Sequence, residues 1–298
     1  MAKRRLLVVG GSGLVGTNLV LAARAKWDVF ATFYKHRVDF EDVEELALDI
    51  RDFQQASAIV RAVSPDVVVL ASAFMDVDGC QKDPQTARET HAMGARHIAK
   101  VAGSDMALVY VSTDYVFDGN KGRPYSEQDA TAPVNVYGQT KLEGEEEVRA
   151  HAKEFTIVRP AQIWGENPFT HKPTLVQKVV SALQAGQEIQ LVSDQVQSPT
   201  YAPELALDIL ALAHAEERGV FHAGGASAIS RYEMGRQVAR TWGLDEELVR
   251  PVKLKDAGLP ARRPLNVSLS RAKIEGAVGR RVPPCLDSLA LFKAGVAA

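Results

Sequence analysis

Short apolar segments alternate with longer segments of helical periodicity through the first half of the chain, and this alternation restricts the fold more than any other feature. We predict that the apolar segments are strands buried on both faces of a sheet: Leu6–Val9, Asp28–Phe33, Asp66–Ala71, Ala107–Ser112 and Phe155–Val158. Helices are predicted between them: Leu14–Ala25, Phe53–Val63, Pro84–Ala102 and Val136–Ala152. This order indicates an α/β fold with a doubly wound parallel sheet, because parallel strands are joined by right-handed crossovers.

The second half of the chain is less regular. Prolines become frequent after Arg159, and long irregular segments separate the predicted helices Leu175–Gln184 and Pro203–His214. We therefore expect a main domain over residues 1–160 and a smaller lobe over residues 161–298. The short apolar segment at 219–222 is expected to return to the main sheet as a further strand.

Composition and charge limit the kinds of molecule that the protein is expected to bind. The 298 residues are 46% hydrophobic, and 35 Lys and Arg stand against 37 Asp and Glu, so neither a nucleic acid nor an anionic membrane is expected as a partner. No apolar run approaches the roughly 18 to 20 residues that cross a bilayer. The apolar segment near the start is too short for a signal peptide, so we expect a cytoplasmic protein. Scattered histidines and two isolated cysteines, Cys80 and Cys285, give no metal-ligand spacing.

The stretch VVGGSGLVG places three glycines between the first predicted strand and the first predicted helix. Glycine torsions permit the tight turn, and backbone N–H groups can then approach a pyrophosphate at the positive end of the helix. This context predicts a Rossmann-type dinucleotide site at Gly10, Ser12, Gly13, Leu14, Val15 and Gly16. A glycine-rich turn without a ligand is the structural alternative.

The end of the second predicted strand bears on the choice of dinucleotide. Lys35, His36 and Arg37 follow this strand, and no carboxylate appears before Asp39. A carboxylate at this place holds the ribose hydroxyls of NAD, whereas cations suit the 2′-phosphate of NADP. We therefore predict NADPH as the preferred cofactor and NADH as the alternative, against the structural alternative of a solvated basic turn.

Tyr137 and Lys141 lie four residues apart in a predicted helix, so their side chains share one face. A nearby ammonium group lowers the pKa of a phenol, which is ordinarily about 10. Tyr137 is then suited to exchange a proton with a carbonyl oxygen while Lys141 also holds the nicotinamide ribose. Two surface residues at this spacing are the alternative.

The stretch STDYVFDG begins where the fourth predicted strand ends. Ligands of parallel sheets bind beyond the carboxyl ends of the strands, so Thr113 is placed to hydrogen-bond a substrate carbonyl oxygen beside the nicotinamide. The alternative is that Ser112 or Thr113 caps a turn, and only one of the two hydroxyls needs to face a site.

Together these motifs resemble the extended short-chain dehydrogenase/reductase superfamily and, within it, the dTDP-4-dehydrorhamnose reductase (RmlD-like sugar-nucleotide-binding) family. Further stretches carry the resemblance over nearly the whole chain: LDI from Leu48, ASAFMDVDGCQKDP from Ala71, SPTYAPELA from Ser198 and RRPLNVSLSRAKI from Arg262. The resemblance implies an NAD(P)-dependent oxidoreductase that transfers hydride from NADPH to the 4-keto group of a nucleotide-linked deoxysugar. It leaves the sugar, the nucleotide and a homo-oligomeric state open.

The resemblance also implies roles for individual residues. Thr113, Tyr137 and Lys141 would be the catalytic set. The cofactor would contact Asp49 and Ile50 on its adenine side and, further along, Ala71, Ser72, Ala73, Tyr137 and Lys141. The substrate would contact Thr113, Asp114, Arg263 and Asn266.

Two positions depart from the family pattern. Thr90-His91 stand where the family commonly has Val-Asn, and Gln162 replaces an aromatic residue. Both changes bear on the identity of the sugar more than on the hydride chemistry. Two other functions stay open as alternatives: a sugar-nucleotide epimerase or dehydratase of the same superfamily, and a non-catalytic NADP-binding regulatory subunit.

Overall fold

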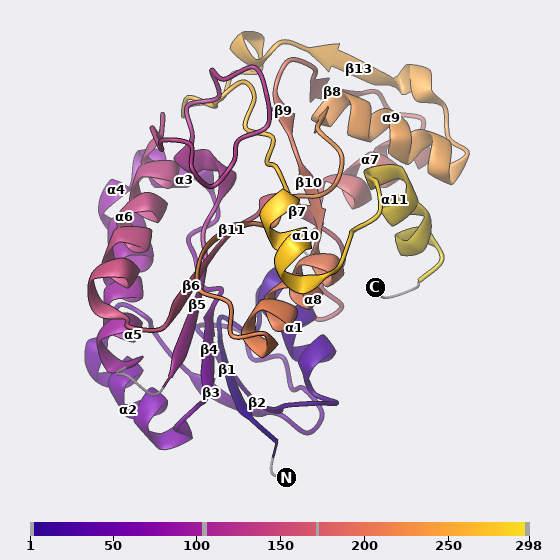
Figure 1. The fold of residues 1–298 in the computed structure, drawn as a ribbon. Coiled ribbons are helices and arrows are strands. Elements are labelled where there is room, and N and C mark those ends of the chain that lie inside the picture. Colours follow the sequence, from indigo (N-terminus) through magenta and orange to yellow (C-terminus); the bar gives the residue numbers. More distant parts are fainter. Residues whose placement is uncertain (1–2, 103–105, 171–172, 296–298) are drawn as a thin grey trace.

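The computed structural model describes residues 3–102, 106–170 and 173–295 (Figure 1). The strands are β1 Arg5–Val9, β2 Asp28–Phe33, β3 Glu44–Ala47, β4 Val67–Leu70, β5 Ala107–Val111, β6 Phe155–Arg159, β7 Ala161–Trp164, β8 Ile189–Val192, β9 Val196–Gln197, β10 Pro199–Tyr201, β11 Gly219–His222, β12 Ile229–Ser230 and β13 Val249–Val252. The α-helices are α1 Leu14–Ala23, α2 Phe53–Val63, α3 Val77–Lys82, α4 Pro84–Arg88, α5 Gly94–Ala102, α6 Val136–His151, α7 Leu175–Gln184, α8 Ala202–His214, α9 Arg231–Trp242, α10 Ala272–Val278 and α11 Cys285–Lys293.

A parallel sheet of seven strands forms the centre of the molecule, in the order β11-β6-β5-β4-β1-β2-β3. In the register of this sheet, Leu6 of β1 lies between Val29 of β2 and Val67 of β4. Chain order reverses at β1 and β4, and open α/β sheets bind ligands at such a switch point. The predicted fold class is confirmed.

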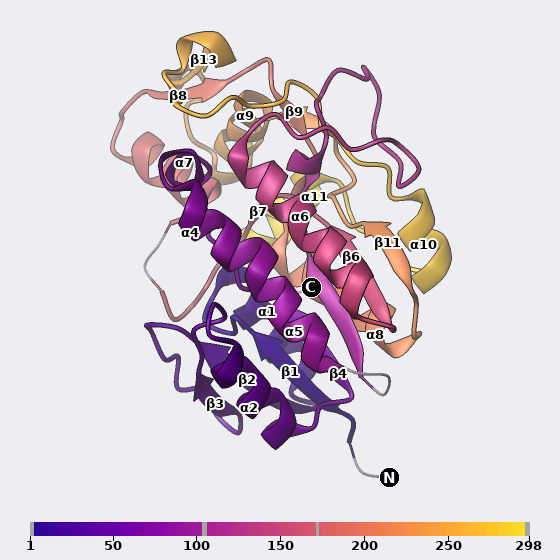
Figure 2. The same ribbon diagram turned by 90° about the vertical axis from the view of Figure 1, so that its left-hand side faces the viewer.

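Two layers of helices cover the sheet (Figures 1 and 2). Successive side chains of a strand point to opposite faces. Leu6 and Val8 therefore pack in the core beneath α1 and α8, whereas Leu7 and Val9 pack in the core beneath α2, α5 and α6. Both faces of the sheet are buried, which explains the unbroken apolar runs in the sequence.

The main domain draws on chain beyond residue 160. Leu205 and Ile209 of α8 belong to the same core as α1, and β11 pairs with β6 through Val220 and Ile157. Helix α10 joins the same core through Ile274, whereas α7, α9 and α11 surround a separate core and form the smaller lobe at the top of Figure 1. This lobe lies over the carboxyl ends of the central strands.

Several elements differ from the sequence-based prediction, and two of them lie in the main domain near the site. The unpredicted strand β3 has the polar sequence EELA at the edge of the sheet, where Glu45 accepts the N–H groups of Val38 and Phe40. The predicted helix Pro84–Ala102 is divided by a π-helical turn at Glu89–Met93. In the described part of the chain, no helix has both the length and the apolar character to cross a bilayer.

Candidate active site

A cavity of about 360 Å³ lies between the carboxyl ends of the strands and the smaller lobe. The main domain contributes seven of the residues predicted for the site: Val15, Ala71, Ala73, Thr113, Asp114, Tyr137 and Lys141. The structure therefore brings the predicted catalytic set into one cavity with part of the predicted cofactor cradle. The lobe contributes Gln162, Lys178, Gln197 and Arg231.

The glycine turn borders this cavity through Val15, and its backbone packs tightly against neighbouring backbone. Gly10 has a φ of 91°, and a Cβ atom there would lie 2.8 Å from the backbone nitrogen of Ser72. A Cβ on Gly16 would lie 2.1 Å from the carbonyl oxygen of Gly10, so both positions require glycine. No side chain caps the start of α1 after Gly13, which leaves its first N–H groups to meet an anion.

Thr113 is both a cap and a cavity residue. Its hydroxyl donates to Oδ1 of Asp114 at 3.0 Å and accepts the N–H of Tyr115 at 3.2 Å. The other oxygen of Asp114 accepts from Nε2 of Gln197 at 2.8 Å. Burial raises the pKa of Asp114 to about 7, and these hydrogen bonds oppose that rise.

The neighbouring hydroxyl of Ser112 has a structural role. It donates to Glu145 at 2.6 Å, and Arg159 binds the same carboxylate at 2.8 and 2.6 Å. Arg159 and Glu145 are both buried. Ser112 thus ties β5 to a buried ion pair, which leaves Thr113 as the hydroxyl available to a ligand.

The electrostatics of the tyrosine and lysine pair differ from the expectation. Burial raises the pKa of Tyr137, against a hydrogen bond from Thr113 that lowers it. Lys141 donates to the carbonyl oxygen of Val111 at 2.6 Å and lies 4.2 Å from the centroid of the Tyr110 ring. Burial lowers the pKa of Lys141 to about 7. The expected lowering of the Tyr137 pKa by Lys141 is therefore not found in this structure, in which burial is the largest influence on that pKa.

His91, at one of the two departures from the family pattern, joins the loop after β4 to helix α6, which carries Tyr137 and Lys141. Its Nε2 accepts the N–H of Phe74 at 2.9 Å, and its Nδ1 lies 2.8 Å from the hydroxyl of Thr140 on α6. Because Phe74 donates, Nε2 must be unprotonated, and Nδ1–H is left to donate to Thr140. Burial lowers the pKa of His91 to about 2, which keeps the ring neutral. The π-helical turn places this ring between the two elements.

The predicted adenine side gathers around the end of β2. Lys35 and His36 are exposed, and Arg37 pairs with Asp39 at 2.9 Å and lies 3.7 Å from Glu45. Arg51, which the sequence analysis missed, pairs with Asp49 at 2.6 Å and donates to the hydroxyl of Tyr34 at 3.1 Å. Arg51 follows the predicted Asp49 and Ile50 directly in the sequence, so its place beside them was the signal available.

Two residues predicted to contact the substrate are engaged elsewhere. Arg263 pairs with Asp78 at 3.0 Å, and the side-chain oxygen of Asn266 accepts from Ser268. Neither belongs to the cavity lining, and their contact with a substrate stays a prediction. The cavity instead contains Lys178, Gln197 and Arg231, which no motif marked. The sequence near Arg231 offers one signal, the capping box of Ser230 and Glu233, which indicates the start of a helix and no binding role.

Known proteins resemble this chain along nearly its whole length. The family model described as RmlD substrate binding domain matches residues 4–294. The dTDP-4-dehydrorhamnose reductase of Mycobacterium tuberculosis H37Rv is 37% identical over 89% of this chain and 84% of its own. A probable low-salt glycan biosynthesis reductase, Agl14 of Haloferax volcanii, is 30% identical over 96% of both chains.

A solved structure agrees with these relatives. The dTDP-4-dehydrorhamnose reductase of Bacillus anthracis in complex with NADP superposes with a TM-score of 0.86 at 25% identity, over 99% of this chain and all of the other. The predicted resemblance is confirmed. The chain belongs to the RmlD substrate-binding-domain family, within the extended short-chain dehydrogenase/reductase superfamily.

Proposed function

We propose that this protein is an NADPH-dependent reductase that delivers hydride to the keto group of a nucleotide-linked deoxysugar, of the kind represented by dTDP-4-dehydrorhamnose. The observation that carries the proposal is the convergence of Thr113, Tyr137 and Lys141 in one cavity at the switch point of the sheet. Family membership and the NADP complex of a relative support the same activity.

The chain offers a fitting cradle for the dinucleotide. Gly10 and Gly16 allow the turn to pack closely against the backbone of Ser72 and of Gly10, and the start of α1 then presents uncapped N–H groups to a pyrophosphate. Lys35 at the end of β2 suits a 2′-phosphate. Bound NADPH supplies the hydride; the residues described below position the carbonyl group and manage the proton.

Tyr137 acts as the proton donor. Its raised pKa keeps the phenol protonated at neutral pH, which is the state needed to protonate the oxygen of a reduced carbonyl. Thr113 lines the same cavity, and its hydroxyl, which donates to Asp114 in this structure, turns to donate to that oxygen when the substrate binds. Lys141, with a pKa of about 7, is suited to hold the nicotinamide ribose and to return a proton toward Tyr137.

Consumption of NADPH tests this function against the two alternatives. A reductase oxidises one NADPH for each molecule of dTDP-4-dehydrorhamnose that it reduces. An epimerase or dehydratase recycles its cofactor and converts substrate without net oxidation. A regulatory subunit binds NADPH and leaves the sugar unchanged, and either of the last two results would contradict the proposal.

A further inference from the structure

Two residues that line the cavity on the side of the smaller lobe each carry one buried polar atom without a protein partner. Six buried side-chain atoms in the described part of the chain lack a hydrogen-bond partner. Two of them, Nε of Arg231 and Oε1 of Gln197, belong to residues that line the cavity. A buried polar atom left unpaired costs about 1–3 kcal/mol. Two such atoms on residues that line the same cavity point to a ligand group that satisfies both.

The fold holds these two residues in place. Gln197 of β9 pairs with Ile229 of β12, and Arg231 follows two residues later as the first residue of α9. Ser230 and Glu233 form a capping box that fixes the start of this helix. The amide of Gln197 is oriented by its bond from Nε2 to Asp114, so its carbonyl oxygen is the atom left over.

Arg231 differs in this respect from the other arginines of its helix. Arg236 and Arg240 both pair with Glu246, at 2.9 and 2.6 Å. No carboxylate among the described residues forms an ion pair with Arg231. Neither Arg236 nor Arg240 lines the cavity. Arg231 therefore retains its hydrogen-bonding capacity for a ligand, whereas its neighbours stabilise the lobe.

The chemistry of the two atoms selects the ligand group. A guanidinium N–H only donates, and an amide oxygen only accepts. A hydroxyl group satisfies both, since its oxygen accepts one bond while its hydrogen is donated. A phosphate or carboxylate would accept from Arg231 but would face the amide oxygen and Asp114 with its own negative charge. Thr113 in the same cavity places the hydroxyl on the sugar that carries the reacting carbonyl.

Resting on the proposed reductase function, we propose that Arg231 and Gln197 form a sugar-hydroxyl subsite. One ring hydroxyl of the substrate accepts from Nε–H of Arg231 and donates to Oε1 of Gln197. This subsite makes Arg231 a specificity-determining residue, because a substrate that lacks the hydroxyl leaves both buried atoms unpaired.

Single-deoxy substrates test the subsite. Values of kcat/KM are measured with saturating NADPH for dTDP-4-dehydrorhamnose and for its analogues lacking the hydroxyl at C2 or at C3. The proteins are the wild type, Arg231→Met and, as the matched control on the same helix, Arg236→Met. We expect the wild type and the control to prefer the intact sugar to one analogue by about 10–100-fold, the value of a hydrogen bond to a charged group. Arg231→Met should lose that preference.

The outcomes separate this inference from the function on which it rests. Unchanged preference in Arg231→Met, or no preference in the wild type, overturns the subsite while the reductase activity stands. If the wild type turns over none of these sugars, calorimetry gives Kd for dTDP-rhamnose and its deoxy forms. The ratio of these Kd values in each protein then replaces the ratio of kcat/KM values. Absence of both turnover and binding overturns the proposed function together with the subsite.

Discussion

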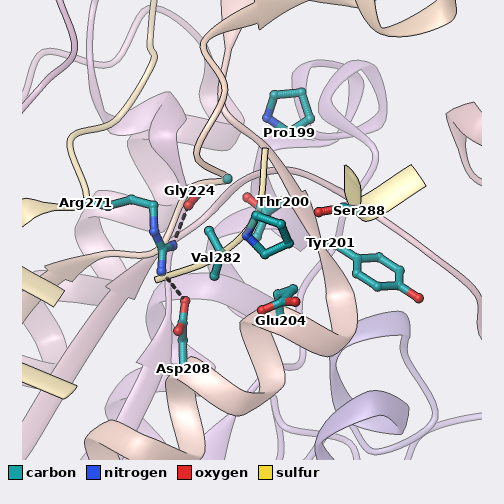
Figure 3. Close-up of a pocket in the computed structure, with 11 residues that line it drawn as sticks. Pro199, Thr200, Tyr201, Glu204, Asp208, Gly224, Arg271, Val282 and Ser288 are labelled. Atoms are coloured by element: carbon teal, nitrogen blue, oxygen red, sulfur yellow. Dashed lines mark hydrogen bonds and ion pairs between the residues drawn. The ribbon is translucent and has the colours of Figure 1, made fainter. Parts of the chain in front are cut away.

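Two largely buried clusters of polar and charged side chains differ in how many of their groups have partners within the chain. The first, which we call the α8 cluster, contains Glu204, Asp208, Arg271 and Arg280. Figure 3 shows Arg271 between the carboxylate of Asp208, at 2.8 Å, and the carbonyl oxygen of Gly224, at 2.5 Å. Arg280 adds a second bond to Asp208 at 2.7 Å and pairs with Glu204. Both carboxylates of the α8 cluster therefore have cationic partners within the chain.

The second, which we call the cavity cluster, contains Asp114, Gln197 and Arg231. Asp114 receives only neutral donors, from Thr113 and Gln197, and Arg231 Nε has no partner among the described residues. The contrast teaches which cluster serves folding and which serves binding. The carboxylates of the α8 cluster are paired with arginines of the chain and stabilise the fold, whereas under the proposed subsite the unpaired atoms of Arg231 and Gln197 would gain their partners from a substrate.

The largest effect on activity is expected when the proposed proton donor, Tyr137, is removed. Tyr137→Phe removes the hydroxyl and should lower kcat by about 10²–10⁴-fold, the usual value of general acid catalysis. Binding of NADPH, measured by calorimetry, should be little changed. Tyr125→Phe is the matched control, because the Tyr125 hydroxyl bonds to Asp118 and Tyr125 does not line the cavity. Full activity in Tyr137→Phe would rule out the assigned role.

Breaking the α8 cluster should instead cost stability. Arg271→Met deprives Asp208 of one of its two cationic partners in the interior and should lower the free energy of unfolding by about 3–5 kcal/mol. Arg250→Met removes an exposed pair with Glu188 and should cost about 0–1 kcal/mol. Urea titrations of both variants check the comparison, and equal losses would contradict it. The activity per folded molecule should be retained in both.

Acidification tests the buried imidazole that supports the cavity. The pKa of His91 falls from about 6.5 in the unfolded chain to about 2 in the folded protein, so its protonation favours unfolding as the pH drops below 6.5. At pH 5 this linkage lowers the free energy of unfolding by about 2 kcal/mol. The raised pKa of Asp114 acts in the opposite direction over the same range.

The difference between two proteins therefore isolates the effect of His91. From pH 8 to pH 5, wild type should lose about 2 kcal/mol more unfolding free energy than His91→Asn, which has no imidazole to protonate. Urea titrations at both pH values measure the difference. Parallel losses in the two proteins would show that His91 is not held neutral in the fold.

The smallest expected effect is on KM for NADPH. It compares replacement of two cations at the end of β2, one with an ion-pair partner and one without. Lys35 forms no ion pair with a described residue, whereas Arg37 pairs with Asp39. Lys35→Ala should raise KM for NADPH about tenfold, because a hydrogen bond to a charged group contributes about 1.5 kcal/mol. Arg37→Ala should raise it less, and KM for NADH should respond to neither. A larger effect of Arg37→Ala would break the rule drawn from the two clusters.

The sequence predicted the elements whose burial leaves a clear pattern. The central strands are apolar on both faces, and the glycine turn is required by backbone contacts at Gly10 and Gly16, so both were readable from one chain. Strand β3 was missed because it lies at the edge and is polar. The π-helical turn was missed because apolar periodicity continues through it.

The side of the cavity that the main domain forms was predictable from the sequence, whereas the side that the smaller lobe forms was not. Thr113, Tyr137 and Lys141 lie next to a strand end or share a helix face, so local sequence placed them. Gln197 and Arg231 meet the cavity only through the pairing of β9 with β12 and the packing of the lobe over the sheet. Such contacts depend on tertiary structure, which no local pattern reports.

The transfer of deuterium from cofactor to sugar tests the central claim most directly. NADPH deuterated at both C4 positions of the nicotinamide is incubated with dTDP-4-dehydrorhamnose and the wild-type protein, and the product is analysed by mass spectrometry and NMR. We predict one deuterium at C4 of the sugar for each NADP⁺ formed. A product without deuterium at C4, or an unchanged sugar beside an intact cofactor, would contradict the account.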